Sequence, residues 1–215
     1  MTDFPVHAND VHIYSQNTTY AVARSTSLGY SNDPNLDVGQ WKNGLNFLCL
    51  RPFLAFNTSA TPDDATITQV NLKLVCIVDN SDTDFDVQII KQDWSAWFGD
   101  LANATKREAA WDACLAGTAD ASIWRNTSGM SINTAYTSGN LATDWVNKTG
   151  YTYYSLLSSR DKGANEPSGK EYISIASGNN TTEAYRPVLT VTYTEAGTLL
   201  KVNFNAQMQN LAGGF

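Results

Sequence analysis

The segment from residue 51 to residue 78 constrains the fold of this chain more than any other part of the sequence. Residues 66–78 alternate strictly, and one face of this run is apolar. The positions on that face are Val70, Leu72, Leu74, Cys76 and Val78. A period of two residues is the pattern of a β-strand with one face in a core. A second apolar run, residues 47–56, precedes it across a polar loop at 62–64, and such a pair is typical of a β-sandwich core.

Short strand-like runs continue along the chain, separated by turn residues such as Asn, Asp and Gly. The predicted strands cover residues 10–14, 20–24, 47–56, 66–78, 85–92, 151–157, 172–176, 187–194 and 198–204. Many short strands joined by polar turns favour an all-β fold, an antiparallel, jelly-roll-like β-sandwich, over alternating strands and helices. We expect residues 1–195 to form this domain.

One short helix is predicted to be inserted into the strand pattern. Thr105 and Glu108 have the spacing of a capping box, in which both side chains bond amides of the first helical turn. Trp111, Cys114 and Leu115 then share one face at helical spacing. We expect this helix to pack on the core and to cap one open end of the sandwich.

Residues 196–215 are predicted to form a C-terminal strand and docking tail. Residues 198–208 alternate again and could form a hairpin with the preceding strand through the turn at 195–197. An exposed strand edge is a template for pairing with another chain. We therefore expect a homo-oligomer or larger assembly, with contacts from Leu200, Val202, Phe204, Met208 and Phe215.

Composition limits the partners of this chain. The formal net charge is −7 and charged residues make up only 16% of the sequence. With no basic stripe to neutralise phosphates, we expect no nucleic-acid partner. No run of 18 apolar residues exists, so no membrane span is predicted. The first ten residues do not match a secretory signal peptide, and viral structural proteins reach the exterior without one.

Four stretches of the chain resemble one known family. Residues 51–74 pass from an aromatic strand, through a loop with Pro62, into the sequence Ala-Thr-Ile-x-x-Val-x-Leu-x-Leu. The other stretches are residues 30–39, 154–160 and 186–193. Together they resemble the domain family labelled DNRLRE over roughly residues 10–194, although residues 99–143 depart from its pattern. The resemblance implies a jelly-roll-like sandwich related to carbohydrate-binding modules, with a role in adhesion or glycan binding on an extracellular or cell-surface protein.

Aromatic side chains are the candidates for glycan contacts, because sugar CH groups stack on flat rings while hydroxyls bond polar neighbours. The candidates are Trp41, Trp94, Trp97, Trp145, Tyr151 and Tyr153, with Arg160 nearby in sequence. Tyr151 and Tyr153 have the opposite parity to Tyr154, so one set can be exposed while the other is in the core. Burial in the core remains the alternative for every tryptophan. Because Arg and Lys are few, a neutral glycan is the easier ligand to accommodate.

Two other kinds of site leave alternatives open. Asp79, Asp82 and Asp84 place oxygen ligands at near-alternating positions, which could hold structural calcium or could form a hairpin turn, and residues 33–37 are a second acidic loop. No other cofactor is predicted.

Asn-x-Ser/Thr sequons are either glycan acceptors or chance products of the composition, and we favour chance. They begin at Asn17, Asn57, Asn103, Asn126, Asn147, Asn179 and Asn180.

The sequence offers little for catalysis. The two histidines, His7 and His12, lack zinc spacing, and no nucleophile motif is present. Cys49, Cys76 and Cys114 are more readily explained as buried thiols than as a Cys49–Cys76 disulfide. We predict a non-catalytic structural or adhesion module on the exterior of a virion or surface assembly. The alternative is a carbohydrate-binding module from a secreted polysaccharide-processing protein or an archaeal cell-surface protein.

Overall fold

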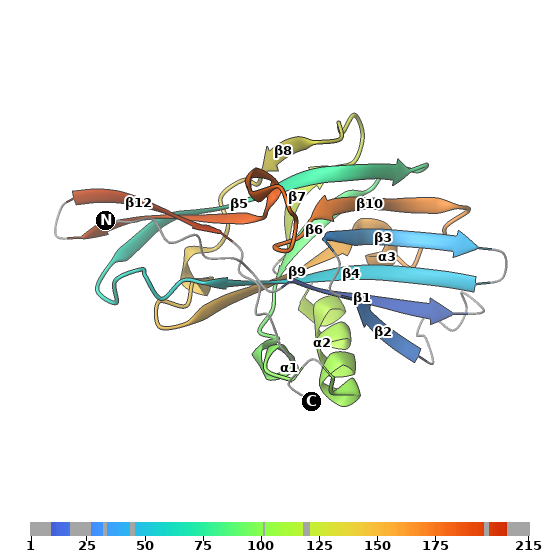
Figure 1. Ribbon diagram of the computed structural model, residues 1–215, viewed down its shortest axis with the longest axis horizontal. Helices are drawn as coiled ribbons and strands as arrows, with labels where there is room; N and C mark the ends of the chain where they lie inside the picture. The colour runs from blue at the N-terminus through green and yellow to red at the C-terminus, as the bar shows by residue number, and fades with distance from the viewer. Residues whose placement is uncertain are drawn as a thin grey trace.

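The computed structural model describes residues 10–17, 27–31, 34–43, 46–100, 102–117, 121–195 and 198–205. These residues form an all-β fold in which one antiparallel sheet curls around a core, with a few short helices outside it (Figure 1). The predicted fold class is therefore confirmed. The predicted strand at 20–24 lies outside the described residues.

The first six strands carry the earlier half of the sheet. They are β1 (Asp10–Asn17), β2 (Ser27–Ser31), β3 (Asn35–Asn43), β4 (Asn46–Asn57), β5 (Thr66–Ser81) and β6 (Asp86–Lys91). The later half is formed by β7 (Ser122–Asn126), β8 (Thr134–Thr137), β9 (Tyr151–Ser158), β10 (Lys170–Ala176), β11 (Val188–Glu195) and β12 (Thr198–Asn205). Four of these strands, β2, β3, β7 and β8, were not predicted from the sequence.

The order of the strands shows how distant parts of the chain meet. Hydrogen-bonded neighbours run β12-β11-β5-β10-β3-β4-β9-β6-β7, while β1 pairs with β2 and β4, and β8 pairs with β5. All these pairings are antiparallel. Strand β9 is central to the site described below, because it lies between β4 on one side and β6 on the other.

The inner side of the curled sheet encloses the larger core, built from alternate residues of β3, β4, β5, β6, β9, β10 and β11. The alternation predicted for β5 is confirmed. Val70, Leu72, Leu74 and Cys76 are fully buried, and Val78 on the same face is partly buried. Each such aliphatic side chain contributes about 2 kcal/mol by leaving water.

A second core lies on the outer side of the sheet, where α1 (Ser95–Phe98) and α2 (Ala104–Ala116) cover β4, β6 and β9 (Figure 1). Trp111 and Cys114 of α2 are buried there, and Leu115 is partly buried against the same cluster. The predicted apolar face is thus confirmed, but the prediction that the helix caps an open end of the sandwich is wrong. It lies across strands whose outward residues are also apolar.

The predicted capping box is also wrong. Helix α2 begins at Ala104, so its N-cap is Asn103, whose side chain accepts a hydrogen bond from the backbone N–H of Lys106. Asparagine at the N-cap satisfies an amide that otherwise has no partner in the first turn. Thr105 and Glu108 therefore lie two residues too late in the chain to serve as the box.

Two ion pairs fasten α3 (Ser159–Lys162) to the outer side of the sheet. Arg51 of β4 donates from Nε and Nη2 to both carboxylate oxygens of Asp161, at 2.7 and 3.0 Å. In the second pair the helix supplies the cation, because Arg160 of α3 pairs with the carboxylate of Glu171 in β10. The side chains of Arg51 and Asp161 are only 4% and 7% exposed, so a charged pair lies inside the second core.

The C-terminal strand joins the main sheet. Strands β11 and β12 form an antiparallel hairpin in which Glu195 lies opposite Thr198 and Val188 opposite Asn205. Val202 packs against the larger core. The predicted hairpin is confirmed, whereas the predicted assembly contacts Met208 and Phe215 lie outside the described residues, as do the side chains of Leu200 and Phe204.

Candidate functional site

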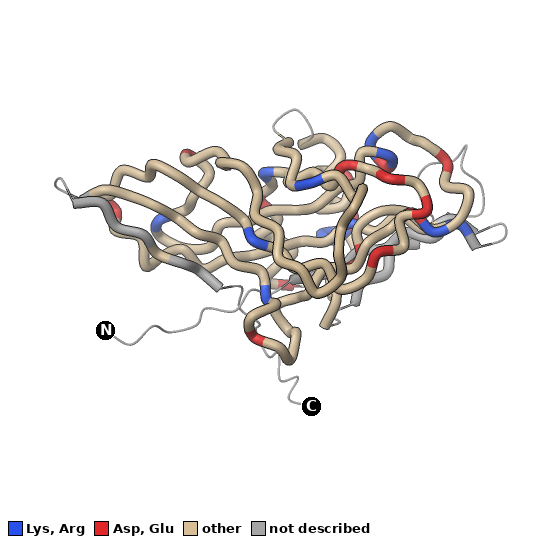
Figure 2. Tube along the Cα trace, turned by 90° about the horizontal axis from the view of Figure 1, so that it is seen from above, with Lys and Arg blue, Asp and Glu red and all other residues tan. Residues whose placement is uncertain are grey.

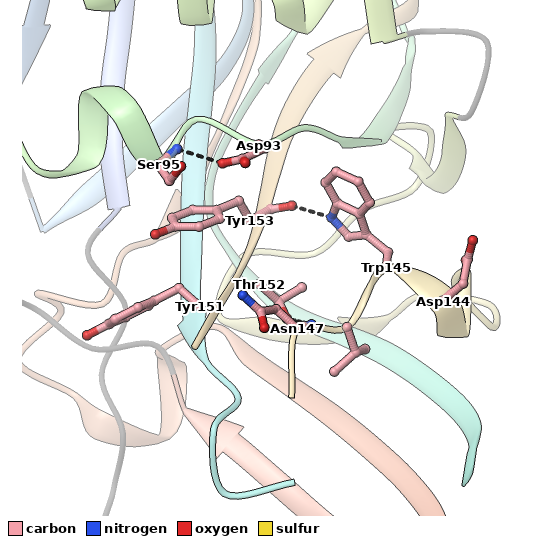
Figure 3. Close-up of a pocket in the computed structure, with 9 residues that line it drawn as sticks. Asp93, Ser95, Asp144, Trp145, Asn147, Tyr151, Thr152 and Tyr153 are labelled. Atoms are coloured by element: carbon pink, nitrogen blue, oxygen red, sulfur yellow. Dashed lines mark hydrogen bonds between the residues drawn. The ribbon is translucent and has the colours of Figure 1, made fainter. Parts of the chain in front are cut away.

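The candidate site lies where β6 ends beside β9. The last paired residues of these strands are Lys91 and Tyr154, so residues 151–153 of β9 continue without β6 alongside. The chain after β6 turns away into α1, and the segment at 143–147 approaches from the other direction. These three segments surround an open pocket with a volume of about 420 Å³ (Figure 3).

Nine residues from the three segments line this pocket, and they include both polar and aromatic side chains. The lining residues are Asp93, Ser95, Asp144, Trp145, Val146, Asn147, Tyr151, Thr152 and Tyr153. We call this the β9 pocket. A volume of this size falls in the range of small-molecule sites.

Two tyrosines provide the flat surface of the pocket. Tyr151 and Tyr153 are two residues apart on β9, so their rings point to the same face, with centroids 6.1 Å apart and planes inclined by 29°. Both side chains are half-buried, whereas Tyr154 on the opposite face is 1% exposed. The expected division is therefore confirmed only for the core side: Tyr154 belongs to the larger core, whereas Tyr151 and Tyr153 are partly buried against the second core.

Trp145 fixes the other side of the pocket. It belongs to the short 3₁₀ helix η2 (Thr143–Trp145), and its indole Nε1 donates a 2.6 Å hydrogen bond to the carbonyl oxygen of Tyr153. That carbonyl lies on the stretch of β9 that β6 no longer accompanies. The Trp145 ring thus lies across β9 from the two tyrosine rings (Figure 3), and Lys91 Nζ lies 5.8 Å from its centroid.

Carboxylates flank the aromatic surface. Asp93 Oδ1 accepts a 2.9 Å bond from the backbone N–H of Ser95, which holds this aspartate at the start of α1. Burial, and secondarily the nearby charge of Asp93, raises the pKa of the Tyr153 phenol to about 12. The phenol therefore stays protonated at neutral pH and can donate a hydrogen bond to a ligand.

The two aspartates lie at different ends of the pocket. Figure 3 shows Asp93 above Tyr153 and Asp144 beyond Trp145. Glycoside cleavage needs two carboxyl groups facing each other across one bond. The β9 pocket instead offers ring faces and separated polar groups, which is an arrangement suited to holding a ligand.

Two of the predicted glycan contacts are wrong. Trp94 and Trp97 are 2% and 1% exposed in the second core, so neither offers a ring face to a sugar. The Trp94 ring lies 5.3 Å from the Tyr153 ring, edge to face, and its Nε1 bonds the carbonyl oxygens of Leu54 and Tyr154. This tryptophan supports the pocket from behind.

The structure does not bring the other predicted contacts to the β9 pocket. Trp41 is partly exposed on β3, beside Lys170 of β10 and Leu48 of β4. Arg160 is in α3 and is paired with Glu171. Of the glycan residues predicted from the sequence, Tyr151, Tyr153 and Trp145 come together.

The predicted calcium ligands do not converge. Within the described part of the chain, no group of three or more His, Cys, Asp or Glu side chains is placed to hold a metal ion. Asp79 Oδ1 instead accepts a bond from the backbone N–H of Ser81, which is the local bonding of a turn. Asp82 and Asp84 are exposed.

Five of the seven sequon asparagines have local structural roles, and the side chain of Asn17 lies outside the described residues. In the turns that start at Asn57, Asn126, Asn147 and Asn180, the asparagine Oδ1 accepts a bond from the backbone N–H two residues later. Asn103 caps α2. Asparagine followed by Ser or Thr at this spacing is thus the sequence of an Asx turn or a helix cap.

The cysteines are free and buried. Cys76 lies in the larger core and Cys49 in the second core, on opposite sides of the sheet. The Cys49–Cys76 disulfide considered from the sequence is therefore ruled out by geometry, and the interpretation as buried thiols is confirmed.

Sequence reasoning missed most of the polar lining, namely Asp93, Ser95, Asp144, Asn147 and Thr152. These residues lie in loops or at strand ends without a recognisable motif. The Asx-turn spacing at Asn147 and the Asp-Trp-Ser start of α1 were the available signals, and neither indicates a ligand without the fold.

No helix in the described ranges is long and apolar enough to cross a membrane.

Comparison with protein-family models and with curated proteins found no match for this chain. The resemblance to the DNRLRE family stays a prediction.

Proposed function

We propose that this chain is a non-catalytic module that binds a glycan in the β9 pocket. The single observation that carries the proposal is the pair of half-buried, nearly parallel rings of Tyr151 and Tyr153 beside hydrogen-bonding side chains. A sugar ring has apolar CH faces and polar edges. Rings below and carboxylate, amide and hydroxyl groups at the sides match both surfaces.

The rigidity of the pocket supports this proposal. Tyr153 is held by Trp94 behind it and by Phe98, whose ring centroid lies 5.7 Å away. Phe98 also contacts Tyr151, at 5.1 Å. Aromatic side chains that are already fixed lose little conformational entropy when a ligand binds, so more of the contact energy remains as affinity.

We place this module on the exterior of a virion or another surface assembly, as the uncharged polar composition and the resemblance suggest. The alternative context is a carbohydrate-binding module of a secreted polysaccharide-processing protein or an archaeal surface protein. Both contexts use the same pocket, and they differ in the assembly state of the chain.

A glycan array followed by titration calorimetry on the strongest neutral ligand tests the binding function. Changing Tyr153→Ala or Tyr151→Ala is expected to weaken affinity about tenfold, because each removes one stacking surface. Trp41→Ala is the matched control, since it removes a partly exposed aromatic side chain outside the pocket. Circular dichroism establishes that each variant is folded.

The proposal fails if no glycan binds, or if Trp41→Ala weakens binding as much as the two tyrosine variants. Tyr151→Ala is the more informative variant. Tyr151 contacts Phe98 and Tyr153, whereas Tyr153 also supports Trp94.

A second function, assembly with neighbouring subunits, is favoured by the position of β12. Among the described strands, β12 pairs with β11 alone, so its other edge presents backbone groups that another strand could bond. Mass measurement in solution tests this. A stable multimer is expected, and a monomer at micromolar concentration would contradict assembly while leaving glycan binding intact.

A further inference from the structure

The charge of the β9 pocket distinguishes between classes of glycan. Two of its nine lining residues, Asp93 and Asp144, are acidic, and none of the nine is Lys or Arg. Both aspartates are exposed at the pocket. Lys91, at the end of β6, has its Nζ 5.8 Å from the centroid of the Trp145 ring.

The carboxylates retain capacity for a ligand. Asp93 uses Oδ1 for the backbone N–H of Ser95, and a carboxylate oxygen can accept more than one hydrogen bond. Its second oxygen has no hydrogen-bond partner among the described residues. The same is true of both oxygens of Asp144.

Aromatic faces add to this preference for positive charge. The face of a tyrosine ring carries partial negative charge and attracts a nearby cation. Tyr153 lies next to Asp93, and Tyr151 lies further along β9 (Figure 3). An acidic sugar would meet like charge in the pocket, whereas an ammonium group at Asp93 would meet a carboxylate and the Tyr153 ring.

We propose that the β9 pocket selects a glycan that carries a free, protonated amine, with an amino sugar seated on Tyr151 and Tyr153 and its ammonium group at Asp93. The inference rests on the proposed glycan-binding function and narrows its ligand class. Asp144, beyond Trp145, attracts a second ammonium group on a later sugar of the same oligosaccharide.

Oligosaccharides of equal length derived from cellulose, chitin and chitosan provide the test. They share one backbone and differ in the substituent at the second carbon, which is hydroxyl, acetamide or amine. We expect the chitosan-derived ligand to bind about fivefold to tenfold tighter than the cellulose-derived one at low salt, since each charge contact contributes modestly. Added salt should reduce this preference by screening.

Matched variants locate the preference. Asp93→Asn keeps the shape and removes the charge, so it should abolish most of the preference for the chitosan-derived ligand over the cellulose-derived one. Asp82→Asn is the control, because it makes the same change of net charge at an exposed turn at the far end of β5. The control should leave the preference intact.

Each contrary result has a definite meaning. Equal affinity for cellulose-derived and chitosan-derived ligands overturns the amine proposal while the glycan-binding function stands. If Asp82→Asn lowers the preference as much as Asp93→Asn, attraction to the overall charge of −7 explains it and the proposal is overturned. If none of the three oligosaccharides binds while another glycan on the array does, the amine proposal is overturned and the glycan-binding function stands; if no glycan binds at all, both fail.

Discussion

At the scale of single residues, Arg51 is an informative side chain. It is nearly inaccessible to water, yet it bonds both oxygens of Asp161 and donates from Nη1 to the carbonyl oxygen of Trp111 at 2.9 Å. Its guanidinium also lies 3.8 Å from the centroid of the Trp111 ring. Burial alone would lower the pKa of Arg51, but Asp161, with smaller effects of Cys114 and Cys49, more than offsets this and the net shift is upward.

This pairing predicts a large cost for removing one partner. Asp161→Ala leaves a buried guanidinium without its carboxylate and should lower the free energy of unfolding by about 3 to 5 kcal/mol in urea titrations. Glu166→Ala is the control. It breaks an ion pair with Lys42 whose side chains are 49% and 36% exposed, and should cost less than about 1 kcal/mol. Equal losses in the two variants would contradict the assigned role of the buried pair.

The buried thiols predict a loss of stability in alkali. Burial raises the pKa of Cys114 from 9.0 to about 11, against a smaller opposing effect of Arg51. Between these values the unfolded chain has lost the thiol proton and the folded chain retains it, so stability falls as pH rises. For Cys114 this amounts to about 1 kcal/mol between pH 7 and pH 10.

Urea unfolding at pH 7 and at pH 10 measures this loss of stability. Cys114→Ala should be less stable at pH 7, because it leaves a cavity, but its stability should decline less towards pH 10 than that of the unchanged chain. An identical decline in both proteins would show that Cys114 does not contribute to the alkaline loss.

At the scale of elements, β3 depends on one glycine. Gly39 has φ of +130°, and a Cβ atom there would lie 2.2 Å from the carbonyl oxygen of Glu171 on the adjacent strand β10. Both the backbone conformation and the close approach exclude other residues. The pairing of β3 with β10 and β4 therefore requires glycine at this position.

Gly39→Ala should accordingly cost more than roughly 4 kcal/mol or prevent cooperative folding. Gly129→Ala separates the two causes. Gly129 also has a positive φ, of +68°, but no atom lies within 4 Å of its Cβ position, so backbone strain alone should cost about 1 to 2 kcal/mol. Chemical denaturation compares them, and similar losses would mean that the contact with Glu171 is unimportant.

The elements also show which sequence signals suffice. The strand at 66–81 was predictable because its alternating residues all face one core. Strand β3 was not, since it combines Leu36 and Val38 with a buried Gln40 and the unusual Gly39. Strand β7 could not be predicted from the sequence for another reason. It has five residues, with Trp124 buried and Ile123 57% exposed, so hydrophobicity does not mark its inner face.

At the scale of the whole molecule, the candidate site arises from segments far apart in sequence. The parity of Tyr151 and Tyr153 was readable from the chain, but their meeting with Asp93 and Trp145 depends on β6 ending before β9 does. The burial of Trp94 and Trp97 likewise follows from α1 folding onto the outer side of the sheet. No local sequence pattern predicts either the meeting of these pocket residues or the burial of the two tryptophans.

The distribution of charge is also a property of the whole molecule. Lys and Arg are scattered among Asp and Glu along the described trace (Figure 2). A net charge of −7 repels other polyanions over a distance of about 10 Å at ordinary salt. Under the proposed function, selection among ligands would therefore begin before contact and be completed by the pocket.

The central claim is that a sugar lies on the Tyr151 and Tyr153 rings, and saturation-transfer NMR tests it most directly. Irradiating the aromatic protons of the protein should transfer magnetisation to the CH protons on one face of the bound sugar. The double variant Tyr151→Ala and Tyr153→Ala should abolish this transfer, whereas Trp41→Ala should preserve it. Transfer that persists without the two tyrosines, or that vanishes with Trp41, would contradict the account.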